Sequence, residues 1–145
     1  ALSILVVGVL GAMSLLSQSL GLNRTVSNQL IGTYLAAEGV EVVKNLIDTN
    51  LIQGRVWNSG FGNGNFEADY KSTALEASGE RPLLFDATSG RYGYGRGETT
   101  AFLRTIKIKL VSSAEIRVNS VLEWRGKGGR VFEINLEDHF FGWRQ

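Results

Sequence analysis

The first 23 residues of the chain, ALSILVVGVLGAMSLLSQSLGLN, contain no charged side chain and no proline. They run directly into residues 24–50, which also lack proline, because the single proline of the chain is Pro82. This uninterrupted stretch predicts one helix of roughly fifty residues, about 75–80 Å long at 1.5 Å per residue. That length exceeds the diameter expected of a domain this size. The helix should therefore project from a folded head, and its uncharged half requires an apolar environment.

Two environments suit residues 1–23. A run of about 22 uncharged residues is long enough to cross a bilayer, so an ordinary membrane anchor is one interpretation. The polar residues between 14 and 19 make a mediocre lipid span, however. Small residues at helical spacing, Gly8 with Ala12 and Ser17 with Gly21, favour close packing against other helices instead. Glycine weakens a helix by up to about 1 kcal/mol relative to alanine, and we expect bending or unwinding at 21–23.

Residues 24–50 have the periodicity of an amphipathic helix. Charged residues such as Lys44 and Asp48 fall opposite the apolar arc, and Glu38 lies at its border. The helix is expected to end near 48–50, with an extension to residue 52 also possible. The apolar arc includes Ile31, and the residues predicted to pack on a sheet are Leu35, Gly39, Val42, Val43 and Leu46.

The remaining chain predicts an antiparallel sheet. Residues 53–99 contain nine of the 18 glycines and suggest a long connection with a short strand at FEADY and a hairpin at PLLFDATSGRYGYG. Residues 100–145 contain three stretches of period-two alternation separated by short turns, which is typical of an antiparallel meander. The predicted class is α+β: a long N-terminal helix, apolar in its first half and packed by residues 24–52 on a small sheet.

Little in the chain favours catalysis or a cofactor. The net charge is +1, there is no cysteine, and His139 is the only histidine, so neither a catalytic triad nor a thiolate metal site can be assembled. The glycines of 90–97 precede a strand rather than a helix, which favours a hairpin over a phosphate-binding loop. Glu67 and Asp69 lack a calcium-loop pattern and are expected to be solvated strand charges. We expect no enzyme, no cofactor and no metal site.

Two surface features remain as alternatives. Six basic residues of the last two fifths of the chain, with Trp124 nearby, suggest a patch that touches DNA. Tyr92 and Tyr94 suggest an adhesive aromatic surface, although cross-strand packing explains them equally well. The basic residues are Lys107, Lys109, Arg117, Arg125, Lys127 and Arg130.

The chain resembles the type IV pilins and the pseudopilins of type II secretion. The resemblance rests on the apolar N-terminal helix, the glycine-rich connection and the small antiparallel sheet, and it covers most of the chain. Its sharpest part is YLAAEGVEVVKNLIDTN at 34–50, which is similar to an LAQEGIE-containing stretch of bacterial prepilin-type proteins. TTAFLRTIKIKL at 99–110, the Leu-Glu-Trp of 122–124 and the Trp-Arg of 143–144 are similar as well.

Two departures from the family pattern stand out. Such pilins begin with a methylated phenylalanine and carry glutamate at the fifth mature position, whereas this chain begins with Ala1 and has Leu5 there. The sequence ALSILVVGVLGAM fits just after that motif, so we expect the chain to continue about eight residues upstream. The cysteine pair found near the C-terminus of many pilins is also missing. Aromatic packing is expected to hold that end, through Trp124, Phe132, Phe140, Phe141 and Trp143.

The resemblance implies a structural subunit of an extracellular filament, anchored in the cytoplasmic membrane before assembly. Its partners would be further copies of itself, the membrane-embedded assembly machinery, and surfaces or DNA in adhesion or motility. A minor pilin or a secretion pseudopilin is the first alternative, and a membrane-anchored monomeric binding domain is the second. The residues expected to pack in the filament core are Leu2, Leu5, Val6, Val7, Gly8, Leu10, Gly11, Ala12, Leu15, Leu16 and Gly21.

Overall fold

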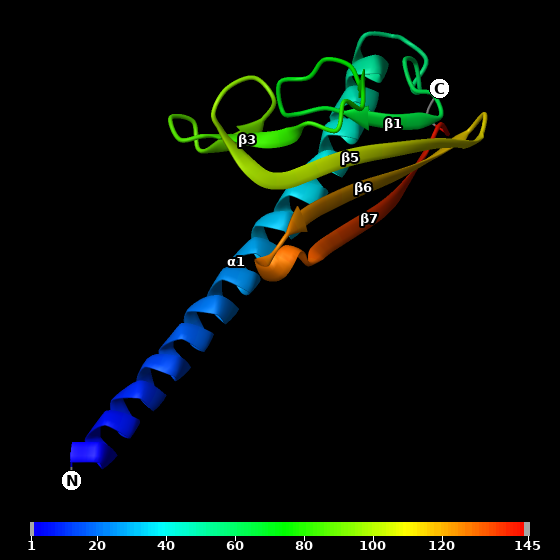
Figure 1. Cartoon of the computed structure of the whole chain (residues 1–145). Helices are drawn as coiled ribbons and strands as arrows, with labels where there is room; N and C mark the ends of the chain where they lie inside the picture. The colour runs from blue at the N-terminus through cyan, green and yellow to red at the C-terminus, as the bar shows by residue number, and fades with distance from the viewer. Residues whose placement is uncertain (1, 144–145) are drawn as a thin grey trace. The chain divides into compact units, whose positions relative to one another are not determined.

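The computed structural model describes the backbone of residues 2–143 and the side chains of residues 24–143. One helix, α1 (Leu2–Ile52), is followed by strands and a single short 3-10 helix, η1 (Lys127–Gly129) (Figure 1). The α+β class is therefore confirmed. The chain divides into two compact units, Ala1–Ile31 and Gly32–Gln145.

The first unit is helical backbone from Leu2 onward. The backbone is also helical at residues 21–23, so the unwinding expected there is wrong. The side chains predicted for the filament core, from Leu2 to Gly21, lie outside those the structure describes.

The second unit contains the rest of α1 and the sheet, in which every strand pairing is antiparallel. Strand β5 is central: β6 lies along one side of it, and β1 and β3 share the other. The outer neighbours are β2 beside β1, β4 beside β3 and β7 beside β6. The strands are β1 (Gly64–Glu67), β2 (Glu76–Ala77), β3 (Pro82–Asp86), β4 (Arg91–Gly93), β5 (Glu98–Ser112), β6 (Glu115–Arg125) and β7 (Val131–Phe141).

The core lies between one face of α1 and the alternating face of β5 and β6. Phe102, Ile106 and Ile108 of β5 are buried, as are the alternate residues of β6. Because side chains of a strand alternate between its faces, every second residue reaches the helix. Fully burying an aliphatic side chain contributes about 1.5–3 kcal/mol, so this interface is the main source of stability. Helix residues Leu35, Ala36, Val42, Val43 and Ile47 are buried, and Leu46 is half-buried against the same core.

Gly39 allows the helix to approach β6 closely. A Cβ atom at this position would overlap the hydroxyl of Ser120 and would lie 3.1 Å from Cδ of Arg104. Both neighbours are buried, so neither has room to move aside. The absence of a side chain at residue 39 thus sets the distance between helix and sheet.

We predict that Gly39→Ala destabilises the head despite the better helix propensity of alanine. Overpacking costs about 1–3 kcal/mol, against a gain of up to about 1 kcal/mol from propensity. The double variant Gly39→Ala/Ser120→Ala removes the overlapping hydroxyl and should recover much of the loss. Urea unfolding of the four chains of this cycle measures the coupling, and strictly additive effects would contradict the proposed contact.

Candidate functional site

Arg104 lies at the centre of the interface between helix and sheet. It belongs to the buried face of β5, and its side chain is only 1% exposed. Its Nη1 donates to the backbone carbonyl oxygen of Leu35 at 2.8 Å and to Oε1 of Glu38 at 3.1 Å. Its Nη2 donates to the carbonyl oxygen of Ala68 at 2.7 Å. One guanidinium therefore joins the helix, the central strand and the segment after β1.

Burial of this cation is tolerated because acceptors surround it. Removing a charge from water costs several kcal/mol unless hydrogen bonds and an opposite charge replace the lost hydration. Glu38, at the border of the helix's apolar arc, supplies that charge. Arg104 Nε and Ser120 Oγ have no hydrogen-bond partner among the described residues. The hydrogen bonds that Arg104 donates are directional, so they fix the position and rotation of the helix on the sheet.

We predict that Arg104→Ala destabilises the head by about 3–5 kcal/mol, because it leaves a cavity and two carbonyls without their donor. Glu38→Gln keeps both carbonyl bonds but removes the opposite charge beside a buried cation, so it should cost about 1.5–3 kcal/mol, less than Arg104→Ala. Urea midpoints of the two variants test the difference. Equal losses of unfolding free energy in the two variants would mean that the ion pair with Glu38, and not the bonds to the carbonyls, provides most of the stabilisation by Arg104.

Two further carboxylates are buried in the glycine-rich region. Glu67 is 1% exposed, and its Oε1 accepts backbone N–H bonds from Gly79 at 2.9 Å and from Arg81 at 3.0 Å. Its Oε2 pairs with Nε of Arg81 at 2.9 Å. Asp69 accepts the backbone N–H groups of Lys71 at 2.9 Å and Tyr94 at 3.0 Å. The expectation that both are solvated strand charges is wrong: they organise the loops around β1.

The proposed surface features are not brought together in the described head. Trp124 is buried against Phe132, with ring centroids 5.4 Å apart. The six basic residues separate, since Lys109 faces Arg117 near one end of β6, whereas Arg125 ends that strand roughly 26 Å away at 3.3 Å per residue. Trp124 is therefore not exposed beside these basic residues, and contact with DNA stays a prediction.

The tyrosines also prove to be packed. Tyr92 is half-buried, with its ring 4.9 Å from that of Phe85. The hydroxyl of Tyr94 donates to the carbonyl oxygen of Arg104 at 3.3 Å. Burial raises the pKa of both phenols above its ordinary value. Among the C-terminal aromatics, Phe140 packs on the core, whereas Phe141 and Trp143 are largely exposed.

His139 is held between two carboxylates on the outer face of β7. Its Nδ1 lies 2.8 Å from Oε1 of Glu115, and its Nε2 lies 2.8 Å from Oε1 of Glu137. Hydrogen bonds to Glu137 and Glu115 raise the pKa of His139. The bonds from His139 and Asn119 lower the pKa of Glu137. Only an imidazolium can donate to both carboxylates at once, so this cluster favours the protonated ring.

We predict a pH window for the stabilising effect of His139. Its raised pKa means that its contribution is complete below about pH 6.5, the ordinary histidine value, and is lost as the pH rises through the folded-state pKa. The lowered pKa of Glu137 means that its contribution is complete above about pH 4.5 and is lost in more acidic solution. The melting temperature of the parent chain should therefore exceed that of His139→Gln most between these limits. A difference that is constant from pH 5 to pH 9 would contradict the assignment.

The described residues were compared with the requirements of a metal site and of a membrane span, and the chain with known proteins. Among residues 24–143, no group of three or more histidine and acidic side chains is placed to hold a metal ion. Within the same range, no helix is long and apolar enough to span a membrane. Comparisons with protein-family models, with curated proteins and with solved structures found no match.

Proposed function

We propose that the chain is the structural subunit of a type IV pilus-like filament and polymerises through its N-terminal helix. The observation that carries the proposal is the continuity of α1. Residues 2–23, which carry no charge, belong to the same helix whose later turns form part of the core of the head. Water penalises exposed apolar surface by about 25 cal/mol per Å², and helices of neighbouring copies provide the cover.

The Arg104 contact supports this assignment. A subunit that is held in a polymer by its helix transmits every load on the head through the interface between helix and sheet. Hydrogen bonds to Leu35 and Ala68, together with close packing at Gly39, resist sliding of the helix along the sheet. Repeated contacts that do not close into a ring generate a helical polymer.

The test is a charge placed in the uncharged segment of the full chain. Leu10→Asp should abolish filaments on the cell surface in electron micrographs, because an unpaired carboxylate in an apolar bundle costs several kcal/mol per subunit. Leu10→Ile is the matched control and should preserve filaments. The urea midpoint of the head should be the same in both variants. Filaments of normal length and number in Leu10→Asp would contradict polymerisation through this helix.

The two alternatives predict other outcomes. A minor pilin or secretion pseudopilin would give sparse, short or tip-located structures when it is the only subunit expressed. A membrane-anchored monomeric domain would give no polymer in either the parent or the variant chain. Long filaments built from this subunit alone distinguish the proposal from both.

A further inference from the structure

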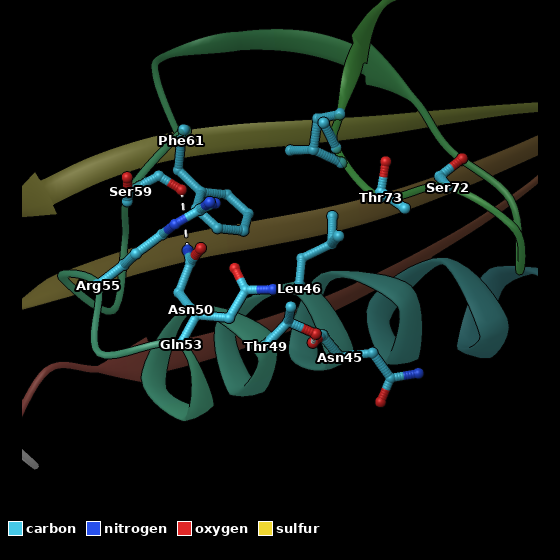
Figure 2. A pocket seen from close by; sticks show the side chains of 13 residues that line it. Asn45, Leu46, Thr49, Asn50, Gln53, Arg55, Ser59, Phe61, Ser72 and Thr73 are labelled. Atoms are coloured by element: carbon cyan, nitrogen blue, oxygen red, sulfur yellow. Dashed lines mark hydrogen bonds between the residues drawn. The ribbon is translucent and has the colours of Figure 1, made fainter.

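A groove of about 480 Å³ lies beside the C-terminal turns of α1 (Figure 2). Three segments form its walls: residues 45–53 at the end of α1, the loop at 55–61 and the segment at 72–75. This volume is within the range of small-molecule binding sites in proteins. The groove lies wholly within the second unit, apart from the uncharged segment that the filament proposal concerns.

The chemistry of the lining is uniform. Except for Arg55, the polar side chains around the groove are neutral amides and hydroxyls, and no carboxylate is among them. Leu46, Phe61 and Leu75 provide an apolar floor that packs on the core. In Figure 2 the ring of Phe61 points into the groove, between the helix and the opposite wall.

The walls are fixed by hydrogen bonds of two buried side chains, those of Asn50 and Asp69. The side-chain amide of Asn50, which is 7% exposed, donates to the carbonyl oxygens of Trp57 at 3.1 Å and Ser59 at 2.9 Å. On the other side, Asp69 accepts the hydroxyl of Ser72 at 3.2 Å. The lining is thus ordered by the fold itself, which reduces the entropy lost on binding.

Several lining side chains are left unused by this framework. The side chains of Asn45, Gln53, Arg55 and Thr73 form no hydrogen bond or ion pair with any described residue, and Thr49 uses only its proton, in a bond to the carbonyl of Asn45. Amides and hydroxyls both donate and accept, as the hydroxyl groups of a sugar require. A guanidinium instead only donates, and it matches the two oxygens of a carboxylate.

We propose that this groove binds a short saccharide that carries a carboxylate, such as a uronic acid. Arg55 pairs with the carboxylate, the amides of Asn45 and Gln53 bind the sugar hydroxyls, and the sugar ring lies on Phe61. A peptide is the less suitable ligand, because none of the lining residues belongs to a strand that could pair with an extended backbone.

The experiment measures binding of methyl glucuronide and methyl glucoside to the full chain by titration calorimetry or ligand-observed NMR. A hydrogen-bonded carboxylate contributes about 1.5–3 kcal/mol, so the glucuronide should bind about ten- to a hundredfold more tightly. Arg55→Gln should remove this preference while leaving the glucoside affinity unchanged. Gln53→Ala should weaken both sugars. Arg96→Gln is the matched control, since Arg96 is exposed and lies outside the groove.

Three results would overturn the proposal: equal affinity for the two sugars, a preference that survives Arg55→Gln, or no binding of either at tens of millimolar. Competition by an unrelated acetylated peptide with equal strength would likewise refute a saccharide site. Arg55 and Gln53 are exposed, so both variants should keep the parent's urea midpoint. Binding should also persist in Leu10→Asp, so failure of the groove and failure of the filament are distinguishable.

Discussion

The donation from Arg104 to the carbonyl oxygen of Leu35 is the constraint on which the head depends. The carbonyl oxygen of Leu35 accepts this bond in addition to the helical hydrogen bond from the amide of Gly39. A one-residue slide of the helix moves this carbonyl about 1.5 Å along the axis and about 100° around it. The guanidinium would then lose its two acceptors on the helix, the carbonyl of Leu35 and the carboxylate of Glu38, and a side chain would fill the space beside Ser120. Arg104 and Gly39 together therefore permit a single register.

Local periodicity was sufficient to predict the class of fold. Period-two alternation identified β5 and β6, and the short turns between them left an antiparallel arrangement as the simplest topology. Boundaries were less accurate, because they depend on contacts between distant residues. The strand expected at FEADY, residues 66–70, lies at Gly64–Glu67 instead. The helix ends at Ile52, as the sequence allowed, and Asn50 uses its side chain to hold the loop at 57–59. No local pattern distinguishes that use from a capping role.

The buried charges could not be predicted for the same reason. In the alternation of β5, Arg104 falls on the same face as Phe102 and Ile106, and this was the available signal that it is buried. Its acceptors, however, lie 36 and 69 residues earlier in the chain, at Ala68 and Leu35. Glu67 likewise has alternation typical of an exposed position, and only the fold brings the amides of Gly79 and Arg81 to its carboxylate. A single charged residue on the apolar face of a predicted strand is therefore a candidate for a buried ion pair or hydrogen bond, and it does not argue against the strand.

The two proposals combine into one physical argument about affinity. A shallow groove that binds a small sugar through a few hydrogen bonds and one ring forms only a weak site, because binding must offset lost translational and rotational freedom. A polymer repeats that site on every subunit, and each further engagement on a multivalent surface becomes intramolecular. Avidity then exceeds the single-site affinity by about 10²–10⁴ without any new contact. The benefit requires that heads hold a fixed orientation on their helices, which is what the Arg104 contact provides. The uncharged segment and the groove occupy separate parts of the chain. A rigid interface between helix and sheet would nevertheless serve both filament assembly and sugar binding.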